Sequence, residues 1–483
     1  MLLDTVEEVF SGDKELFKGL WIYDSDFEFD RLPVIRLDLS GIANETADEL
    51  KYSLNDRLIK KSQIENIKLS GAIPSDTLNH LIEDLYAKHG KKIVVLIDEY
   101  DKPVLDHIGD AEKAEKNRTL LRSVYGVLKS MDSIIQFTFI TGVTKFTKTS
   151  IFSELNNLLD ITLMEDYANI CGITMEEYGI YFDEYVQWIS NLKKFNQCKN
   201  IQDDILAWYN GYSWDGETRL INPFSLFSFF RQKRFSSFWY ASGTPGFMLK
   251  LLKQQPESFL ELKNYELSER MLDSFDIRRI EIEPLLFQTG YLTVDQKIFR
   301  GVVENYLLKI PNREVEEALY LNIIAEFTEK GNAFAEKSYR QIYDSLKSGD
   351  LNIMLDVLKT LFASIPYELH INREAYYHSI FYAVMRTLGL NTESEVSVSG
   401  GRVDAVLKIG NIVYVMEFKY HDCDSGADSE VKEKLINNLL DEGMRQIKEK
   451  GYTDKFANRN STVYRVAFAF LGKDDITMMV ETV

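Results

Sequence analysis

Two short runs near the C-terminus bring together side chains suited to metal-dependent chemistry on a phosphodiester. The first run, RVDAVLKI, contains Asp404, and the second, IVYVMEFK, contains Glu417 and Lys419. Both runs have β-type composition, and the Gly410-Asn411 pair between them is a strong signal for a two-residue hairpin turn. Such a turn places Asp404 directly opposite Glu417.

This pairing has a chemical consequence. Directly opposed residues have Cβ atoms about 5 Å apart, so the two carboxylates repel each other unless a proton or a cation lies between them. Paired oxygen ligands of this kind suit Mg²⁺ or Mn²⁺. Lys419 lies two residues beyond Glu417 and projects from the same face, where its ammonium group could hold a phosphate oxygen or a water nucleophile. The hairpin therefore predicts hydrolysis of a phosphodiester bond.

The other face of the hairpin specifies its register. It is wholly apolar and must pack on a core, because a one-residue slip would move its side chains to solvent. Its residues are Val403, Ala405, Leu407, Ile409, Ile412, Tyr414, Met416 and Phe418. The alternative is a surface hairpin with ion pairs from Asp404 to Lys419 and from Arg402 to Glu417. A bare D…ExK string is common by chance, but the register and the flanking sequence favour the metal site.

Helices are expected on both sides of the hairpin. Asn372 is a good helix N-cap, apolar residues after it recur at helical spacing, and Gly389 is a typical helix end. A second helix follows the hairpin. The chain near the end of that helix is basic, with Lys448, Lys450, Lys455 and Arg459. This cluster could line a groove for nucleic acid or form a solvated helix face.

The C-terminal segment resembles the PD-(D/E)XK nuclease superfamily, specifically the nuclease domain of a group of bacterial AAA-ATPase-like proteins. The matching text is EAYYHSIFYAVMRTLG, SEVSVSGGRVD, YVMEFKY and MRQIKEKGYTDKF. The resemblance implies that Asp404 and Glu417 bind metal and that Lys419 is catalytic. It also implies that Gln446 completes the site and that Glu374 adds a metal contact, with exposed polar positions on helices as the alternative for both. Where the motif name has proline, this chain has valine, which is a common substitution in the superfamily.

The N-terminal region contains apolar runs that predict strands of a parallel α/β sheet. PVIRLDL predicts a strand over 33–39, and KKIVVLIDEYDKP predicts a buried strand over 93–97 that ends in Asp98 and Glu99. A second buried strand over 134–140 ends in Thr141. IVVLIDEYD resembles a Walker B strand, in which Asp98 would bind Mg²⁺ and Glu99 would position an attacking water. In the alternative, Asp98 merely caps the next element.

A wider resemblance to the AAA-ATPase-like family covers nearly the whole chain. Its segments include FITGVTKFTKTSIFSELNNLLDIT, WYNGYSW, NPFSLFSFF, FWYASGTP, LLFQTGYLT and IPNREV. It places Thr141 at a polar sensor position beside a bound nucleotide. The sequence departs from the family at the Walker A motif, because it contains no G-x-x-x-x-G-K-[S/T] run to hold the phosphates. MLLDTVEEVF matches the helix that normally follows this motif.

We therefore expect a chain that lacks its N-terminal Walker A segment and the strand before it. Either the sequence begins at an internal methionine, or the region is a degenerate scaffold. The lost strand is expected beside the Walker B strand, so that its absence leaves strand edges unpaired. In both cases we expect no ATP hydrolysis by this chain, and we expect ATP binding only in a full-length form.

Together these patterns predict an α/β protein with an incomplete P-loop-type parallel sheet, a mostly helical middle module and a C-terminal restriction-endonuclease-like α/β domain. The expected domains are residues 1–171 for the AAA-ATPase-like core, 172–311 for the helical, aromatic-rich module, 312–371 for a helical connector and 372–483 for the nuclease domain.

Composition limits the remaining possibilities. The 483 residues are 45% apolar and carry a net charge of −19, which argues against a broad nucleic-acid-binding face. Three cysteines without metal or disulfide spacing, no signal peptide and no membrane-spanning stretch predict a cytoplasmic protein. The predicted function is a Mg²⁺- or Mn²⁺-dependent nuclease, with DNA as the expected substrate. The alternatives are a non-catalytic nucleic-acid-binding or nucleotide-switch regulator and an RNA-directed enzyme, and oligomer formation is open.

Overall fold

The computed structural model describes residues 1–145, 157–196, 198, 200–239, 265–272, 280–328, 331–363, 381, 391–398, 401–423, 428–454, 456, 461–472 and 475–483. The chain forms two compact units. Unit 1 comprises Met1–Cys171, Trp214–Thr218 and Glu266–Leu308, and unit 2 comprises Gly172–Ser213, Arg219–Tyr265 and Lys309–Val483. None of the helices in the described ranges is long and apolar enough to cross a membrane.

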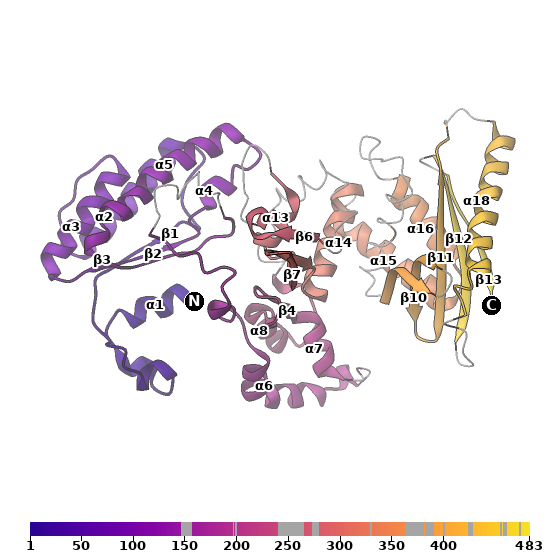
Figure 1. Ribbon diagram of the computed structural model, residues 1–483, viewed down its shortest axis with the longest axis horizontal. Helices are drawn as coiled ribbons and strands as arrows, with labels where there is room; N and C mark the ends of the chain where they lie inside the picture. Colours follow the sequence, from indigo (N-terminus) through magenta and orange to yellow (C-terminus); the bar gives the residue numbers. More distant parts are fainter. Residues whose placement is uncertain are drawn as a thin grey trace. The chain divides into compact units, whose positions relative to one another are not determined.

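Unit 1 contains a three-stranded parallel sheet of β1 (Val34–Asp38), β2 (Ile93–Asp98) and β3 (Ile135–Ile140), in that order. The connecting helices are α2 (Ala47–Ile64), α3 (Pro74–His89), the short α4 (Lys102–Leu105) and α5 (Ala111–Ser130). Helices α2, α3 and α5 lie over one face of the sheet, whereas α1 (Leu2–Val9) lies on the other side (Figure 1). There Leu3 packs against Val94 and Leu96. Short 3-10 helices cover Lys14–Phe17, Trp21–Asp24, Asp132–Ile134 and Glu165–Tyr167.

Two predictions for this sheet are wrong. β3 is not buried, because every one of its residues is half-buried or exposed; it is the edge strand of the described sheet. The lost strand was expected beside the Walker B-like strand, but β2 pairs with β1 on one side and with β3 on the other. Neither edge of β2 is therefore open, and its five residues Ile93–Ile97 are fully buried.

The rest of unit 1 adds strands to the segment over 172–311, which was expected to be mostly helical. β6 (Tyr265–Ser268), β8 (Val303–Lys309) and β7 (Thr293–Arg300) form a second sheet in that order. Two short helices, α12 (Glu269–Leu272) and α13 (Ile282–Gln288), accompany it. The strands β7 and β8 were missed because alternating patterns such as TVDQKIFR contain many polar residues, as expected of a sheet with one solvated face.

The first part of unit 2 is helical, as predicted. It contains α6 (Met175–Ser190), the 3-10 helix Lys193–Phe195, α7 (Ile201–Tyr209) and α8 (Pro223–Gln232), with a small sheet of β4 (Asn210–Tyr212) and β5 (Leu220–Ile221). A capping box at Thr174 and Glu177 fixes the start of α6. Aromatic rings fill the interior, and the pair Phe229 and Phe235 has centroids 4.8 Å apart.

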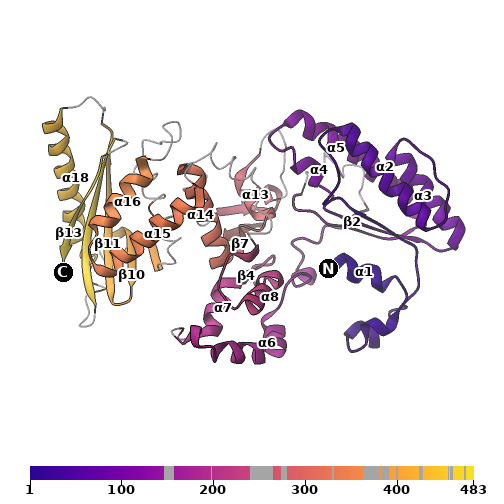
Figure 2. The ribbon, with the colours of Figure 1, turned by 180° about the vertical axis from the view of Figure 1, so that it is seen from behind.

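The C-terminal part of unit 2 is a five-stranded sheet between helices. Its order is β13 (Asp475–Thr482), β12 (Thr462–Leu471), β11 (Ile412–His421), β10 (Gly401–Ile409) and β9 (Asn391–Val398). The strands β9 and β13 were not predicted. Helix α18 (Ser429–Glu449) covers one face, and α15 (Gly331–Ser348) and α16 (Asn352–Ala363) lie on the other side (Figure 2). Helix α14 (Arg313–Thr328) precedes them.

The helices α15 and α16, which were expected to form a connector, pack against the nuclease-like sheet. The Tyr414 hydroxyl donates a hydrogen bond of 2.6 Å to the carbonyl oxygen of Leu346 at the end of α15. Phe362 of α16 contacts Phe470 of β12, with ring centroids 5.8 Å apart. The helix predicted after Asn372 lies outside the described residues apart from Phe381, whose ring packs edge-on against Phe418.

Candidate active site

The hairpin register is the one that the sequence predicts. β10 and β11 pair antiparallel from Ala405 opposite Met416 to Ile409 opposite Ile412. At the turn Gly410 has φ +57°, a left-handed backbone that glycine adopts without strain. The apolar face is buried, as expected, at Ala405, Leu407, Tyr414, Met416 and Phe418.

Asp404 is tied to the part of β11 that carries the other predicted site residues. Its Oδ2 accepts a hydrogen bond of 2.9 Å from the backbone N–H of Phe418. Phe418 lies between Glu417 and Lys419 in the chain, so this bond fixes the Asp404 carboxylate at that point of the strand.

Glu417 is buried and has two polar neighbours from the predicted set. Only 1% of its side chain is exposed, and Lys419 Nζ lies 3.7 Å from its Oε1. The amide of Gln446, on α18, donates a hydrogen bond to the same oxygen. Because an isolated buried carboxylate is strongly disfavoured, this shell explains how Glu417 can be held in the interior. Glu417 is therefore not an exposed residue of a solvated hairpin.

Helix α18 reaches this site because one of its residues has no side chain. A Cβ atom on Gly443 would lie 3.1 Å from Ala467 Cβ and 3.6 Å from Lys419 Cγ. Gly443 and Gln446 are three residues apart and so share one face of the helix. The close approach at Gly443 therefore brings the Gln446 amide down to Glu417. Sequence reasoning named Gln446 but missed Gly443, although a glycine within a long helical pattern was a usable signal.

Small residues on β12 leave room for α18 to approach β11 and β12 closely. In the parallel pairing of β11 and β12, Ala467 is the partner of Glu417 and Ala469 is the partner of Lys419. Both alanines are buried against Leu439, Leu440 and Met444 of α18. Sequence reasoning missed them too. Their signal is the alternation in AFAF, where alanine faces the helix and phenylalanine faces the opposite core.

Other predicted residues are absent from this shell or not described. Glu374 lies outside the described residues, and so do Lys455 and Arg459. Lys448 pairs with Glu481 of β13 at 2.8 Å, and the Lys450 ammonium lies 5.9 Å from the ring centroid of Tyr452. Lys448 is thus already neutralised by an acidic neighbour.

The donor set fits a hard divalent cation. Asp404 and Glu417 supply carboxylate oxygens, the ligands that Mg²⁺ and Mn²⁺ prefer. Gln446 adds a neutral amide beside Glu417. In the described ranges no group of three or more Asp, Glu, His or Cys side chains is arranged to hold a metal, so these two carboxylates are the acidic ligands that the hairpin offers.

The predicted nucleotide-site residues meet at the carboxyl ends of the strands of unit 1. The Thr141 hydroxyl, just after β3, donates a hydrogen bond of 2.6 Å to Asp98 Oδ1 at the end of β2. Glu99 has φ +54°, a conformation that residues other than glycine rarely adopt and that recurs at functional sites. Burial raises the pKa of Glu99, and the nearby charges of Asp101 and Asp98 raise it further.

Asp101 was missed by sequence reasoning. It is fully buried and accepts hydrogen bonds from the backbone of Val143 and from both the backbone and the hydroxyl of Thr144. Burial raises its pKa, although these hydrogen bonds oppose the rise. A Cβ on Gly142 would lie 2.5 Å from Asp101 Oδ1, so the loop after β3 needs glycine there. Asp101 therefore holds the loop that carries Thr141.

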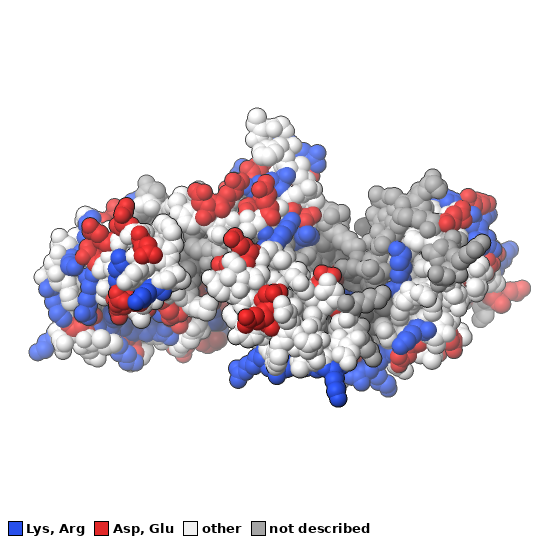
Figure 3. All heavy atoms as spheres, turned by 90° about the horizontal axis from the view of Figure 1, so that it is seen from below, with Lys and Arg blue, Asp and Glu red and all other residues white. Residues whose placement is uncertain are grey.

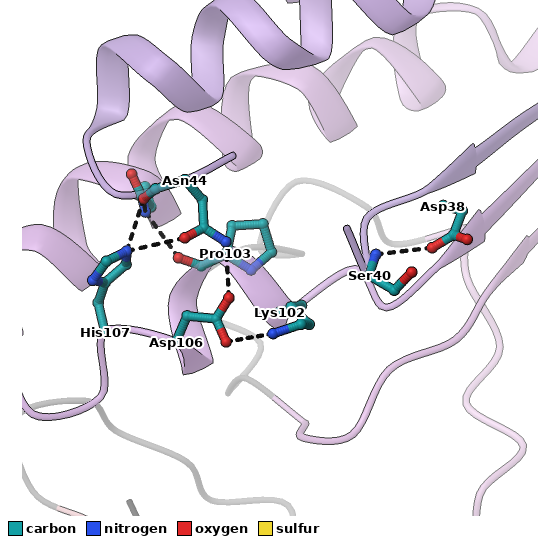
Figure 4. A network of polar contacts seen from close by, with 8 residues as sticks. Asp38, Ser40, Asn44, Lys102, Pro103, Asp106 and His107 are labelled. Atoms are coloured by element: carbon teal, nitrogen blue, oxygen red, sulfur yellow. Dashed lines mark hydrogen bonds and ion pairs between the residues drawn. The ribbon is translucent and has the colours of Figure 1, made fainter. Parts of the chain in front are cut away.

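A second polar network holds the loops after β1 and β2 together (Figure 4). His107 Nε2 lies 2.7 Å from the backbone oxygen of Asn44, and the Asn44 amide donates to Asp106 Oδ2 at 2.9 Å. Asn117 donates to the carbonyl oxygens of Asn44 and Pro103. These contacts are internal to the loops, so the network positions the edge of the sheet rather than offering free groups to a ligand.

Comparisons with known proteins agree with this two-part arrangement. A family model described as a predicted AAA-ATPase matches residues 1–152, and one for the PD-(D/E)XK nuclease superfamily matches residues 372–479. An uncharacterized protein in the vnfD 5' region of Azotobacter chroococcum mcd 1 is 32% identical over 479 residues, which cover 97% of this chain and 87% of that protein. No solved structure matches. The chain therefore belongs to a family of AAA-ATPase-like proteins that carry a C-terminal domain of the PD-(D/E)XK nuclease superfamily.

Proposed function

We propose that this protein is a Mg²⁺- or Mn²⁺-dependent nuclease that hydrolyses phosphodiester bonds in DNA. The observation that carries the proposal is the buried Glu417 carboxylate, which lies beside Lys419 and accepts a hydrogen bond from Gln446. A structural carboxylate on a solvated hairpin would need no such shell.

The roles follow from position. Asp404 and Glu417 would hold the metal ion, which when bound polarises a phosphoryl oxygen and lowers the pKa of a water. Gln446 orients Glu417 by its hydrogen bond. The Lys419 side chain is 13% exposed, which leaves its ammonium able to meet a phosphate oxygen or a water. Glu374 is proposed as a further metal contact on the strength of the resemblance alone.

Cleavage of DNA by the purified chain tests the proposal. Plasmid and linear DNA are incubated with Mg²⁺, with Mn²⁺ or with EDTA, for the wild type and for Glu417→Gln. We expect cutting by the wild type with either metal, none with EDTA, and a loss of about 10²- to 10³-fold in Glu417→Gln, since removing one group that stabilises developing charge costs that much. The matched control is Glu449→Gln, an exposed position on α18, which should cut like the wild type.

Two outcomes would count against the proposal. Cutting that survives in Glu417→Gln would assign the activity to a contaminant or to another site. Metal-independent cutting would remove the role of the two carboxylates. Replacing DNA by RNA of the same sequence in this assay tests the substrate class, because the described site contains no feature that reads the sugar.

We propose that unit 1 is a regulatory region that does not turn over ATP in this chain. The Asp98–Thr141 bond and the left-handed Glu99 support a nucleotide-responsive edge of the sheet, and they favour a nucleotide-switch regulator as the second candidate function. The sequence has no phosphate-binding P-loop motif to hold a triphosphate. Cleavage by wild type that depends on Glu417 would decide for the nuclease.

A further inference from the structure

An aromatic surface on α6 and α8 is large and unusually exposed for a soluble helical module. Tyr181, Tyr185 and Trp188 follow one another at helical spacing on α6, and their exposed fractions lie between 47% and 67%. On α8, Phe224 and Phe227 are 52% and 53% exposed. Contiguous exposed apolar surface of this kind marks an interaction site more often than an isolated exposed ring does.

The two helices present one surface rather than two. Phe182 of α6 stacks on Phe230 of α8, with centroids 5.7 Å apart and rings inclined by 8°. Phe182 also contacts Phe227 at 5.7 Å, and Tyr185 contacts Phe230 at 5.6 Å. The half-buried rings therefore join the exposed rings of the neighbouring helices. Because these contacts fix the rings, little side-chain entropy would be lost on binding.

Cations gather at one end of this surface. The Lys233 ammonium lies 4.6 Å from the ring centroid of Trp188, and Lys194 donates a hydrogen bond to the Lys233 carbonyl oxygen. Lys193 and Arg234 are exposed beside them in the chain. Lys233 ends α8 in the left-handed conformation, with φ +57°. This end of the aromatic surface is basic although the whole chain carries a net charge of −19.

The space-filling view agrees with local rather than uniform charge. The face drawn in Figure 3 shows uncharged surface interrupted by separate groups of Lys and Arg and by separate groups of Asp and Glu. Acidic residues on α6 are nearby, and Asp183 is engaged by the amide of Gln187 at 2.8 Å. Glu184 is an exposed neighbour of the aromatic surface, and its carboxylate would repel phosphate groups. Phosphate groups would therefore be held at the basic end.

We propose that the aromatic and basic surface of α6, α8 and Lys193–Phe195 binds single-stranded nucleic acid. Exposed rings stack on bases in a sequence-tolerant way, and neighbouring lysines hold the backbone phosphates. A duplex hides its base faces, so it cannot use the rings. The substrate class in this inference rests on the proposed nuclease function, whereas the binding surface is separate from the residues of the candidate active site.

Binding is measured in the full chain with Glu417→Gln and with EDTA, so that neither cleavage nor metal contributes. A fluorescent single-stranded DNA oligonucleotide is titrated by anisotropy, beside a duplex and an RNA of the same sequence. Two test variants are Tyr185→Ala with Trp188→Ala, and Lys193→Glu with Lys194→Glu. The controls are Tyr52→Ala, at a 75% exposed ring on α2, and Lys129→Glu, at an exposed position on α5.

We expect the aromatic double variant to weaken single-strand binding at least about tenfold, the effect of one lost stacked base. The lysine double variant should weaken binding and lower the slope of log affinity against log salt by about 1.4. Both controls should stay within about twofold of the parent protein. Trp188→Phe should keep most of the affinity, which separates loss of stacking from loss of folding, and thermal melts check the folding of every variant.

Several results would overturn the inference. One is single-strand binding that is unchanged in both test variants, and another is equal affinity for the duplex. Variants that change the sedimentation of the protein but not its DNA binding would assign the surface to self-association. A wild type that binds no oligonucleotide at low salt would also end the proposal. Failure of the nuclease proposal is seen separately, as absence of Glu417-dependent cutting.

Discussion

Glu417 owes its position to groups from two elements, since Lys419 approaches it from β11 and Gln446 from α18. A buried carboxylate with a fixed hydrogen-bond donor has one orientation, whereas a solvated one samples many. At the scale of single residues, these two neighbours distinguish the arrangement from a chance D…ExK string. In the proposed function, Gln446 acts as a positioning residue for Glu417.

Replacing Gln446 should therefore lower activity without unfolding the protein. We expect Gln446→Ala to reduce DNA cleavage by about 10- to 100-fold, the usual effect of removing a group that orients a metal ligand. The loss should be partly restored at high Mn²⁺ concentration, because a weakened ligand set still binds when metal is abundant. Cleavage is measured against metal concentration, with Arg445→Ala as the control from the exposed side of α18. An unchanged metal dependence would contradict a positioning role.

A second residue-scale prediction concerns Glu314, near the start of α14. Its side chain is fully buried and accepts hydrogen bonds from the Ser225 hydroxyl at 2.9 Å and the Trp239 backbone N–H at 2.8 Å. Burial raises the pKa of Glu314 to about 7, and the nearby charge of Glu317 makes a minor contribution in the same direction, whereas the hydrogen bonds oppose the rise. The native state thus binds the Glu314 proton more tightly than the unfolded state does.

The sign of the pH effect follows. As pH rises from the ordinary carboxyl range to about 7, the unfolded state loses the proton first, so stability falls by about 3 kcal/mol and then stays lower. Glu314→Gln keeps a hydrogen-bond acceptor but carries no charge. We expect it to melt at higher temperature than the wild type at pH 8 and to lose that advantage at pH 5. Glu83→Gln, at an exposed position, should change neither melt. A wild-type advantage at pH 8 would show that the ionised group is stabilising.

At the scale of elements, the packing of α18 on β11 and β12 sets the distance between Gln446 and Glu417. The helix buries Leu440, Met444 and Ile447 against the sheet, and burial of such side chains contributes roughly 1.5–3 kcal/mol each. The missing side chain at Gly443 sets how close the helix comes. A displacement of α18 by a few tenths of an ångström would lengthen the contact from Gln446 to Glu417. A displacement of this size would not unfold the domain.

Enlarging residue 443 tests this argument. Gly443→Val should push α18 away from Ala467 and Lys419, and we expect cleavage to fall at least about tenfold with a modest loss of stability. The control is Gly179→Ala in α6, where nothing lies within 4 Å of the added Cβ; it should stabilise the helix by up to about 1 kcal/mol. Cleavage rates and thermal melts are compared. Full activity in Gly443→Val would mean that the helix does not set the site geometry.

At the scale of the whole molecule, the chain combines an α/β unit whose sequence contains no Walker A motif with a nuclease-like sheet that carries the proposed metal ligands Asp404 and Glu417. The polar edge of unit 1 is organised by buried groups, notably Asp101 and Asn117. Ordered loops of this kind can bind a nucleotide without hydrolysing it. Turnover of ATP additionally needs backbone N–H groups around the phosphates.

The corresponding prediction is an absence of ATP turnover in this chain. Phosphate release is measured with Mg²⁺ and ATP for the wild type and for Glu99→Gln, with and without single-stranded DNA. We expect both to remain at the background of a Glu417→Gln preparation purified in parallel. Turnover that Glu99→Gln abolishes would refute the prediction and would assign the edge of the sheet a catalytic role.

Several features of this protein could be read from local sequence. The Gly410-Asn411 turn and the alternation of its flanking strands determined the register of β10 and β11, because a period of two allows one face to be apolar in only one pairing. The strand ending in Asp98 was also predictable, since its apolar run is local. The resemblance to the nuclease superfamily pointed to Gln446, although the sequence does not show its hydrogen bond to Glu417.

Other features were decided only by tertiary structure. β3 has an apolar sequence yet is the edge of the described sheet, because burial depends on neighbours that no local pattern names. The polar strand β9 and the outer strand β13 form because β10 and β12 offer them backbone partners. The burial of Glu417 beneath α18 depends on a glycine and two alanines from distant segments. Turn type and strand period are short-range properties, whereas the depth of a carboxylate is set by how closely distant elements can pack.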